Sequence, residues 1–186
     1  MHRVITQVRG IGLLVALAAI TVTACGGASG PAALALGTEA VVEHQPYTPA
    51  GAPSSKIGIT PLRLRQGTLA EMEAAGFELE PEDQSKTPMY VDVMYANKGE
   101  STVDRKLDVS LHDQDDNLIN DVVVLDLFGA GEFDACPAHT VGPLAPGESF
   151  ESCSLFLVPS GRTPTRLSFL PHLEGKATDF VYWNVK

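Results

Sequence analysis

The chain has 186 residues, 44% of them hydrophobic, and its 23 acidic residues outnumber its 13 basic ones, which gives a formal net charge of -10. This balance argues against nucleic acid as a partner and against electrostatic adhesion to anionic lipid, since both need patches of Lys and Arg. The acidity alone requires no particular partner, because a net charge far from zero also keeps a protein soluble.

The first 24 residues have the order of a secretory signal. A segment with two arginines and no acidic residue, Met1 to Arg9, precedes an apolar run from Ile11 to Ile20. This is the order of a basic n-region and a short h-region. A helix that spans a bilayer needs about 20 apolar residues, roughly twice the length of this run. We therefore expect residues 1–24 to be a cleaved signal peptide rather than a permanent membrane span.

The sequence VTAC at residues 22–25 is similar to a bacterial lipobox. In that motif small residues precede a cysteine, whose sulfur receives a diacylglyceryl group and which becomes the new N-terminus. Cys25 is therefore the predicted lipidation site, and its acyl chains would hold the protein on the extracytoplasmic side of the cell membrane. The alternative is a secreted protein in which Cys25 has no role. Cleavage leaves eleven basic and twenty-three acidic residues, a net charge near -12.

The next segment reads as a tether. Residues 26–55, GGASGPAALALGTEAVVEHQPYTPAGAPSS, are rich in Gly, Ala, Pro and Ser and lack sustained alternation. We interpret residues 25–55 as a lipidated N-terminus and a flexible tether that separates anchor and domain by about 30 Å. The part from Leu34 to Val42 is compatible with either a helix or a strand. The folded domain is expected to span residues 56–186.

From Lys56 onward apolar and polar residues alternate, which is typical of half-buried antiparallel strands. Turn signals rich in Gly, Pro, Asn and Asp separate the alternating stretches. The sum predicts an all-β, immunoglobulin-like antiparallel β-sandwich. In the first strand the apolar phase slips across Pro61, which predicts a bulge in an edge strand. Seven strands are expected, at residues 57–65, 91–96, 107–112, 118–125, 150–158, 165–170 and 181–185.

One short helix interrupts this pattern around residues 68–75. The sequence from Thr68 to Glu71 fits a capping box, and Gly76 is well placed to end the helix. Two helical turns are too short to be stable alone, so this helix is expected to pack on the sandwich.

Two cysteines remain if Cys25 is lipidated. Cys136 and Cys153 form an even pair in an exported, oxidising setting, and a disulfide between them is predicted. Sixteen residues lie between them, for which loop-closure entropy gives about 3 kcal/mol of stabilisation. The alternative is a metal site made of Cys136, His139 and Cys153, although it lacks the fourth ligand that structural zinc normally takes.

Three stretches resemble a known family: GTLAEMEAAGFELEPEDQSKTPMYVDVMYANKGES, LAPGESFESCSLFLVPSG and the closing FVYWNV. They are similar to exported actinobacterial lipoproteins with an immunoglobulin-like domain of largely unassigned function. The resemblance covers most of residues 56–186. It implies the Cys136–Cys153 disulfide and no catalytic residue.

The acidic loop at residues 113–117 is the candidate metal site. Its weak candidate ligands are Asp113, Asp115, Asp116 and Asn117. An EF-hand would need Gly and Glu where the chain has Leu118 and Val124, so that motif fails. The simpler interpretation is a hairpin tip, because Asp and Asn bond their own backbone and tolerate left-handed conformations.

No catalytic motif is evident. The chain has no Gly-x-Ser-x-Gly elbow and no phosphate-binding Gly-rich loop. The histidines after the tether, His112, His139 and His172, are scattered. A site assembled only in space stays an alternative.

Near the C-terminus, Phe180 and Tyr182 share the strand face opposite Trp183. If Trp183 is in the core, these two rings either form an exposed contact patch or lie under a second layer such as the short helix.

We therefore expect a lipid-anchored, extracytoplasmic binding module without enzymatic activity or cofactor. Its partner would be a protein, a wall polymer or a small ligand. The alternatives are a metal- or ligand-carrying lipoprotein that uses the 113–117 loop, and an enzyme with an unrecognised site.

Overall fold

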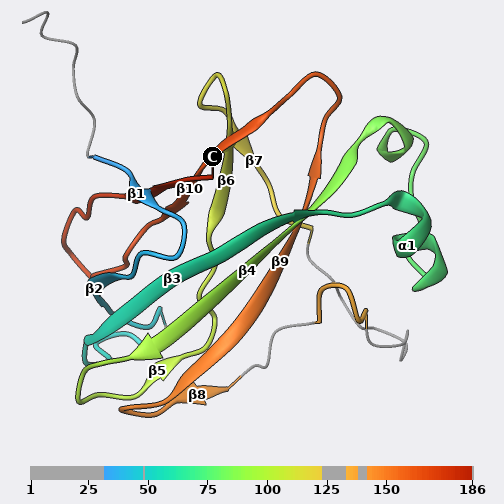
Figure 1. Cartoon of the computed structure of the whole chain (residues 1–186). Coiled ribbons are helices and arrows are strands. Elements are labelled where there is room, and N and C mark those ends of the chain that lie inside the picture. Colours follow the sequence, from blue (N-terminus) through green and yellow to red (C-terminus); the bar gives the residue numbers. More distant parts are fainter. Residues whose placement is uncertain (1–31, 48, 123–132, 138–141, 186) are drawn as a thin grey trace, which may run out of the picture.

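The computed structural model describes residues 32–47, 49–122, 133–137 and 142–185, which form a sandwich of two β-sheets (Figure 1). One sheet has the strand order β1-β11-β10-β6-β7 and the other β2-β3-β4-β9, while β5 and β8 form a small separate ladder. The predicted all-β sandwich is confirmed. The elements are β1 (Leu34–Ala35), β2 (Ala40–His44), β3 (Ser55–Gln66), α1 (Leu69–Ala74), the 3-10 turn η1 (Asp83–Ser85), β4 (Thr87–Asn97), β5 (Val103–Asp104), β6 (Ser110–Asp113), β7 (Leu118–Ile119), β8 (Pro143–Leu144), β9 (Ser149–Val158), β10 (Pro164–Phe169) and β11 (Val181–Asn184).

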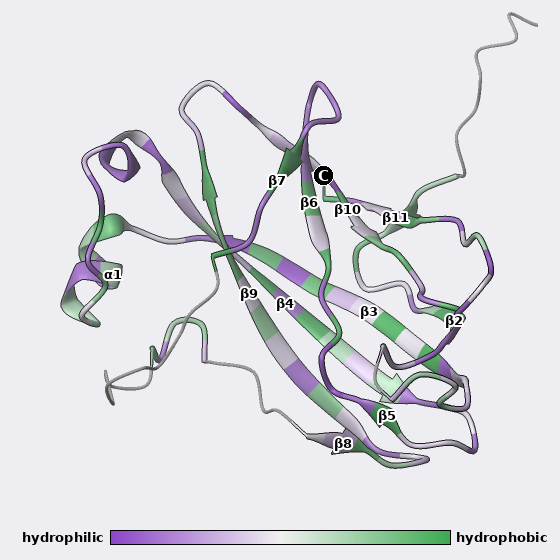
Figure 2. Ribbon diagram, turned by 180° about the vertical axis from the view of Figure 1, so that it is seen from behind, coloured by the Kyte–Doolittle hydropathy of each residue, from purple (hydrophilic) through white to green (hydrophobic). Residues whose placement is uncertain are grey.

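The main core lies between the two sheets. β4 and β9 mix hydrophobic and hydrophilic residues along their length (Figure 2). Val91, Val93 and Phe156 face this core, whereas Tyr90 and Leu155 pack on the other face of the sheet. Trp183 of β11 is fully buried in this core, and its indole N–H donates to the carbonyl of Thr38 at 2.8 Å. Other core side chains, all no more than 1% exposed, are Ile57, Ile59, Val91, Val93, Tyr95, Leu111, Phe156 and Leu167.

The folded part begins earlier than the sequence predicts. β2 pairs antiparallel with β3, from Ala40 opposite Ile59 to His44 opposite Ser55, and β1 pairs parallel with β11. The predicted tether end at residue 55 is therefore wrong. The stretch from Leu34 to Val42, for which the sequence allowed a helix or a strand, contains β1 and the start of β2. Its sequence signal is weak because β2 has only five residues, carries Glu43 on its outer face and is followed directly by a Pro- and Gly-rich turn.

Two predicted strands are shorter in the structure. β6 begins at Ser110, although Leu107 and Val109 are each only 2% exposed; they are buried without a ladder. β7 ends at Ile119, after which the chain crosses to the other sheet and Asp121 bridges Phe156 of β9. Residues 123–125 of the predicted strand lie outside the described residues. The short pair β5 and β8 was not predicted.

The bulge expected at Pro61 is confirmed. The pairing of β3 with β4 shifts register between Pro61 and Arg63. The ladder with β2 ends at Ile59, so Pro61 lies where β3 has become an edge. An edge tolerates a residue that has no backbone N–H to donate.

Helix α1 packs on the outer face of the β4–β9 sheet, as expected. Thr68 caps it with a reciprocal capping box to Glu71. Its end is a Schellman motif in which the N–H of Phe77 donates to Met72 and Gly76 takes a φ of 88°. A second apolar cluster joins helix and sheet, formed by Met72, Tyr90, Phe133, Cys136 and Leu155. No helix in the described part of the chain is long and apolar enough to span a membrane.

Candidate functional site

The acidic loop is the tip of the β6–β7 hairpin, organised around the buried carboxylate of Asp113. One carboxylate oxygen accepts from the backbone N–H groups of Asp115 at 2.9 Å and Asn117 at 2.8 Å. The other accepts from the guanidinium of Arg162 at 2.6 Å. Burial acts to raise the pKa of Asp113, but hydrogen bonds from Asn117, Asp115 and Arg162 outweigh it and hold this pKa below its ordinary value.

The tip itself is turned by Asp116, whose φ is 64°. The hairpin interpretation is thereby confirmed, since Asp tolerates this left-handed conformation. The four predicted ligands are engaged with other groups or with each other. Asp113 pairs with Arg162 and accepts from the side-chain amide of Asn117. Asp116 pairs with Arg166, and Asp115 accepts from Gln114. Among the described residues, no three His, Cys, Asp or Glu side chains are grouped to hold a metal ion.

The predicted aromatic pair lies on the outer face of the β11–β10–β6 sheet, beside the hairpin tip. Phe180 and Tyr182 are half-buried, with ring centroids 5.7 Å apart. The guanidinium of Arg166 stands 4.9 Å above the Tyr182 ring and also pairs with Asp116. Arg166 thus contacts both features predicted from the sequence: the acidic loop, through Asp116, and the aromatic pair, through Tyr182. Helix α1 packs on the other sheet and does not cover these rings.

Leu170 extends this surface. It follows Phe169, a core residue of β10, and is 44% exposed. Strand alternation carries it to the same outer face as Phe180 and Tyr182, because Phe169 pairs with Val181. We call Leu170, Phe180, Tyr182 and Arg166 the outer patch.

Beside the outer patch lies a chain of polar groups that the sequence did not reveal. The Nε2 atom of His112 is 2.8 Å from the hydroxyl oxygen of Ser168, and its Nδ1 atom is 3.2 Å from a carboxylate oxygen of Asp116. The order of the three residues is that of a Ser-His-Asp triad, but among the described residues the Nδ1 atom of His112 has no hydrogen-bond partner of suitable geometry. Ser168, however, has no exposed surface and His112 is 5% exposed. The serine hydroxyl therefore has no access to a substrate in this arrangement.

The sequence contained part of the signal for this site. Arg166 and Ser168 alternate with the core residues Leu167 and Phe169, so their outward direction follows from strand periodicity. Their proximity to Tyr182 depends on the register of β10 against β11, in which Ser168 lies opposite Tyr182. That register is a property of the folded sheet, and no local pattern encodes it.

The structure pairs Cys136 with Cys153 in a disulfide, with Cα atoms 5.3 Å apart. The predicted bond is confirmed, and the alternative metal site is wrong because both sulfurs are bonded to each other. His139, its third predicted ligand, lies outside the described residues, as does Cys25.

His44 is the buried histidine with the most perturbed proton affinity. It is 4% exposed at the end of β2, and its Nδ1 atom accepts the backbone N–H of His172 at 3.2 Å. Burial, and secondarily the nearby His172, lower the pKa of His44 to about 4. The neutral ring thus joins the N-terminal strand to the loop after β10.

This contact should make stability depend on pH. The unfolded chain protonates His44 near its ordinary pKa of 6.5, whereas the folded chain does so only near 4, so stability should fall as pH drops from about 6.5 to 4. The loss should be about 2–3 kcal/mol at about 1.4 kcal/mol per unit. A His44→Asn variant keeps an acceptor and should lose this component. Urea unfolding at pH 7, 5.5 and 4 measures it, and equal pH slopes for both proteins would contradict the assignment.

Comparisons with known proteins support the fold. No known protein family matches the sequence, and no curated protein is significantly similar to it. Among solved structures, the secreted protein MPT63 from Mycobacterium tuberculosis is similar with a TM-score of 0.53 at 14% identity, covering 84% of this chain and 98% of that one. The match confirms the β-sandwich and concerns the fold alone.

Two Bacillus subtilis structures are more distant. The candidate lipoprotein ycdA has a TM-score of 0.48 at 12% identity, covering 79% of this chain and 39% of that one. The yjhA protein has a TM-score of 0.47 at 11% identity, with 81% and 99% covered.

Proposed function

We propose that this chain is an extracytoplasmic binding module held at the cell membrane by lipid on Cys25. The basic n-region, the short apolar run and the VTAC sequence support the anchor. The Cys136–Cys153 disulfide supports the location, because such bonds persist in oxidising compartments. The partner is an envelope component, either a protein or a wall polymer.

One observation carries the binding role: Phe180 and Tyr182 are partly exposed, side by side, on a sheet face that the helix leaves uncovered. Rings fixed on a strand lose little conformational entropy when they bind, and they supply a large apolar area. Arg166 adds a cation that is already held over Tyr182. Aromatic residues and arginine are the residue types most enriched at binding hot spots.

The proposal assigns no catalytic role. Ser168 is buried beneath its neighbours, and the carboxylates of Asp113 and Asp116 are occupied by Arg162 and Arg166. A nucleophile must reach the reacting atom of its substrate before its activation matters. A contact surface needs no such access to a buried group.

Chemical cross-linking on intact envelopes tests this role. A chain with Phe180→Ser and Tyr182→Ser should capture its partner at least fivefold less than the natural chain, because both ring contacts are lost. The matched control carries Val41→Ser and Leu62→Ser, which alter apolar residues 50% and 38% exposed on the other sheet. Equal capture by both double variants would contradict the proposal. In the same preparations, a Cys25→Ala chain should leave the membrane fraction.

A further inference from the structure

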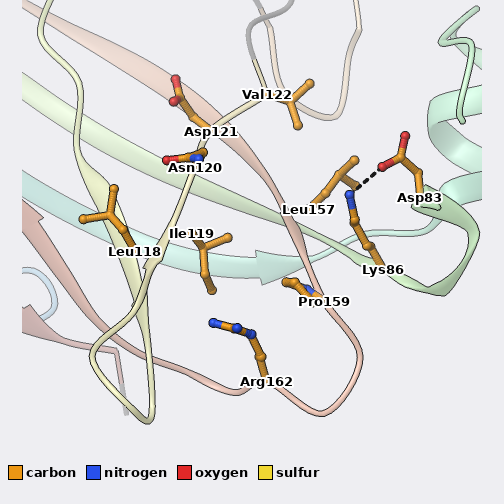
Figure 3. A pocket seen from close by; sticks show the side chains of 10 residues that line it. All are labelled: Asp83, Lys86, Leu118, Ile119, Asn120, Asp121, Val122, Leu157, Pro159 and Arg162. Carbon is orange, nitrogen blue, oxygen red and sulfur yellow. Dashed lines mark hydrogen bonds and ion pairs between the residues drawn. The ribbon is translucent and has the colours of Figure 1, made fainter.

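A concave site lies at the other flank of the acidic hairpin, where the chain that follows β7 runs beside β9. Its volume is about 510 Å³, within the range of small-molecule sites (Figure 3). The chain crosses from one sheet to the other here, through the bridge between Asp121 and Phe156.

The pocket is lined by apolar and polar residues in equal number. The apolar ones are Leu118, Ile119, Val122, Leu157 and Pro159. Ile119 is 5% exposed and belongs to the core, whereas Leu118 is 52% exposed. The pocket thus joins a buried apolar floor to an accessible apolar rim.

Arg162 brings a fixed cation to this pocket. It closes the β9–β10 turn, with its backbone N–H donating to Pro159 at 3.1 Å and Gly161 at a φ of 78°. Its guanidinium binds the buried carboxylate of Asp113, which fixes its position. A guanidinium has five N–H donors, so one bond to Asp113 leaves capacity for another anion. Its side chain is 42% exposed.

The other charged side chains of the pocket are Lys86, Asp83 and Asp121, so its cations and carboxylates are equal in number. Asp83 is occupied by Lys86 at 2.8 Å. The carboxylate of Asp121 lies across the pocket from Arg162 and points away from it in Figure 3. The N–H donors that Arg162 does not use for Asp113 are therefore the charged groups that a ligand would meet, and they select a carboxylate.

We propose that this pocket binds a small organic carboxylate with an apolar chain. The carboxylate lies against Arg162, whose planar fork matches carboxylate geometry. The apolar chain of the ligand lies along Ile119, Leu157 and Leu118. This site is separate from the outer patch, so the proposal does not depend on the function proposed above.

Photolabelling of the full chain in its membranes tests this site. The probe is octanoate with a diazirine in its alkyl chain, and the matched probe is octylamine with the same diazirine. Mass spectrometry should place the octanoate label on residues 118–122 and 157–159, at least tenfold above the amine label. Excess unlabelled octanoate should remove it. Equal labelling of these segments by acid and amine, or labelling that octanoate does not reduce, would overturn the proposal.

Two variants test separately the contacts of the ligand's carboxylate and those of its alkyl chain. Arg162→Gln should reduce labelling at least fivefold, but it also removes the partner of Asp113. Leu118→Asp therefore provides a second variant, because it places a negative charge on an exposed rim residue and should reduce labelling as strongly. Leu62→Ser is the control on β3, which contributes no residue to the lining of this pocket. Undiminished labelling of Leu118→Asp, or equal loss in Leu62→Ser, would also refute the site.

Discussion

A chain that begins at Lys56 is expected not to fold. It lacks β2, which pairs over five residues with β3, and β1, which pairs with β11. It also loses Ala40 from the core and the Thr38 carbonyl that accepts the Trp183 indole N–H. The expected cost is about 5 kcal/mol or more, comparable to the whole stability of many domains.

Urea unfolding followed by tryptophan fluorescence tests this expectation, since Trp183 is the single tryptophan of the chain. A chain that begins at Gly26 keeps every described strand and should show one cooperative transition. A chain that begins at Lys56 should show none at any urea concentration. A cooperative transition at the same midpoint in both chains would contradict the role of residues 34–44.

Removing the disulfide has the second largest expected effect. A chain with Cys136→Ser and Cys153→Ser should lose about 3 kcal/mol, because closing a loop of this length restricts the unfolded chain. The bond also joins Cys136 to β9, next to Phe133, which packs against Tyr90 at 5.6 Å. Weaker packing of this second cluster would add to the loss.

Guanidinium unfolding of the double serine variant measures this loss. The control is Cys25→Ser, which replaces the third cysteine but leaves the Cys136–Cys153 bond intact and should therefore keep the free energy of unfolding of the natural chain. Thiol titration of the denatured, unreduced natural chain gives the complementary result. Two free thiols besides Cys25 would contradict the pairing.

The long strands and the short helix were predictable from the sequence. β4 and β9 have eleven and ten residues and contain alternating stretches such as residues 91–96. The capping box at Thr68 marks the start of the helix, and Gly76 marks its end. Short strands carried too little signal. β2 has five residues, and β5 and β8 have two each, so their pairing depends on tertiary contacts rather than on local pattern.

The sequence identified several residues of the candidate site but not how they lie relative to one another. Tyr182 and the 113–117 loop lie more than sixty positions apart in the sequence, and each showed its own local signature. Arg166 brings them together because β10 lies between β6 and β11. Strand order and register are set by the whole core, so the meeting point, and the burial of Ser168 beside it, emerged only in the folded sheet.

The most direct test of the binding role is hydroxyl-radical footprinting of the protein on intact cells. Oxidation of Phe180, Tyr182 and Leu170 is compared with that of the purified chain, and Tyr47, which is 65% exposed, serves as the internal reference. A partner on the outer patch should lower the oxidation of Phe180, Tyr182 and Leu170 at least threefold while that of Tyr47 is unchanged. Equal oxidation of the patch in cells and in purified protein would contradict the account.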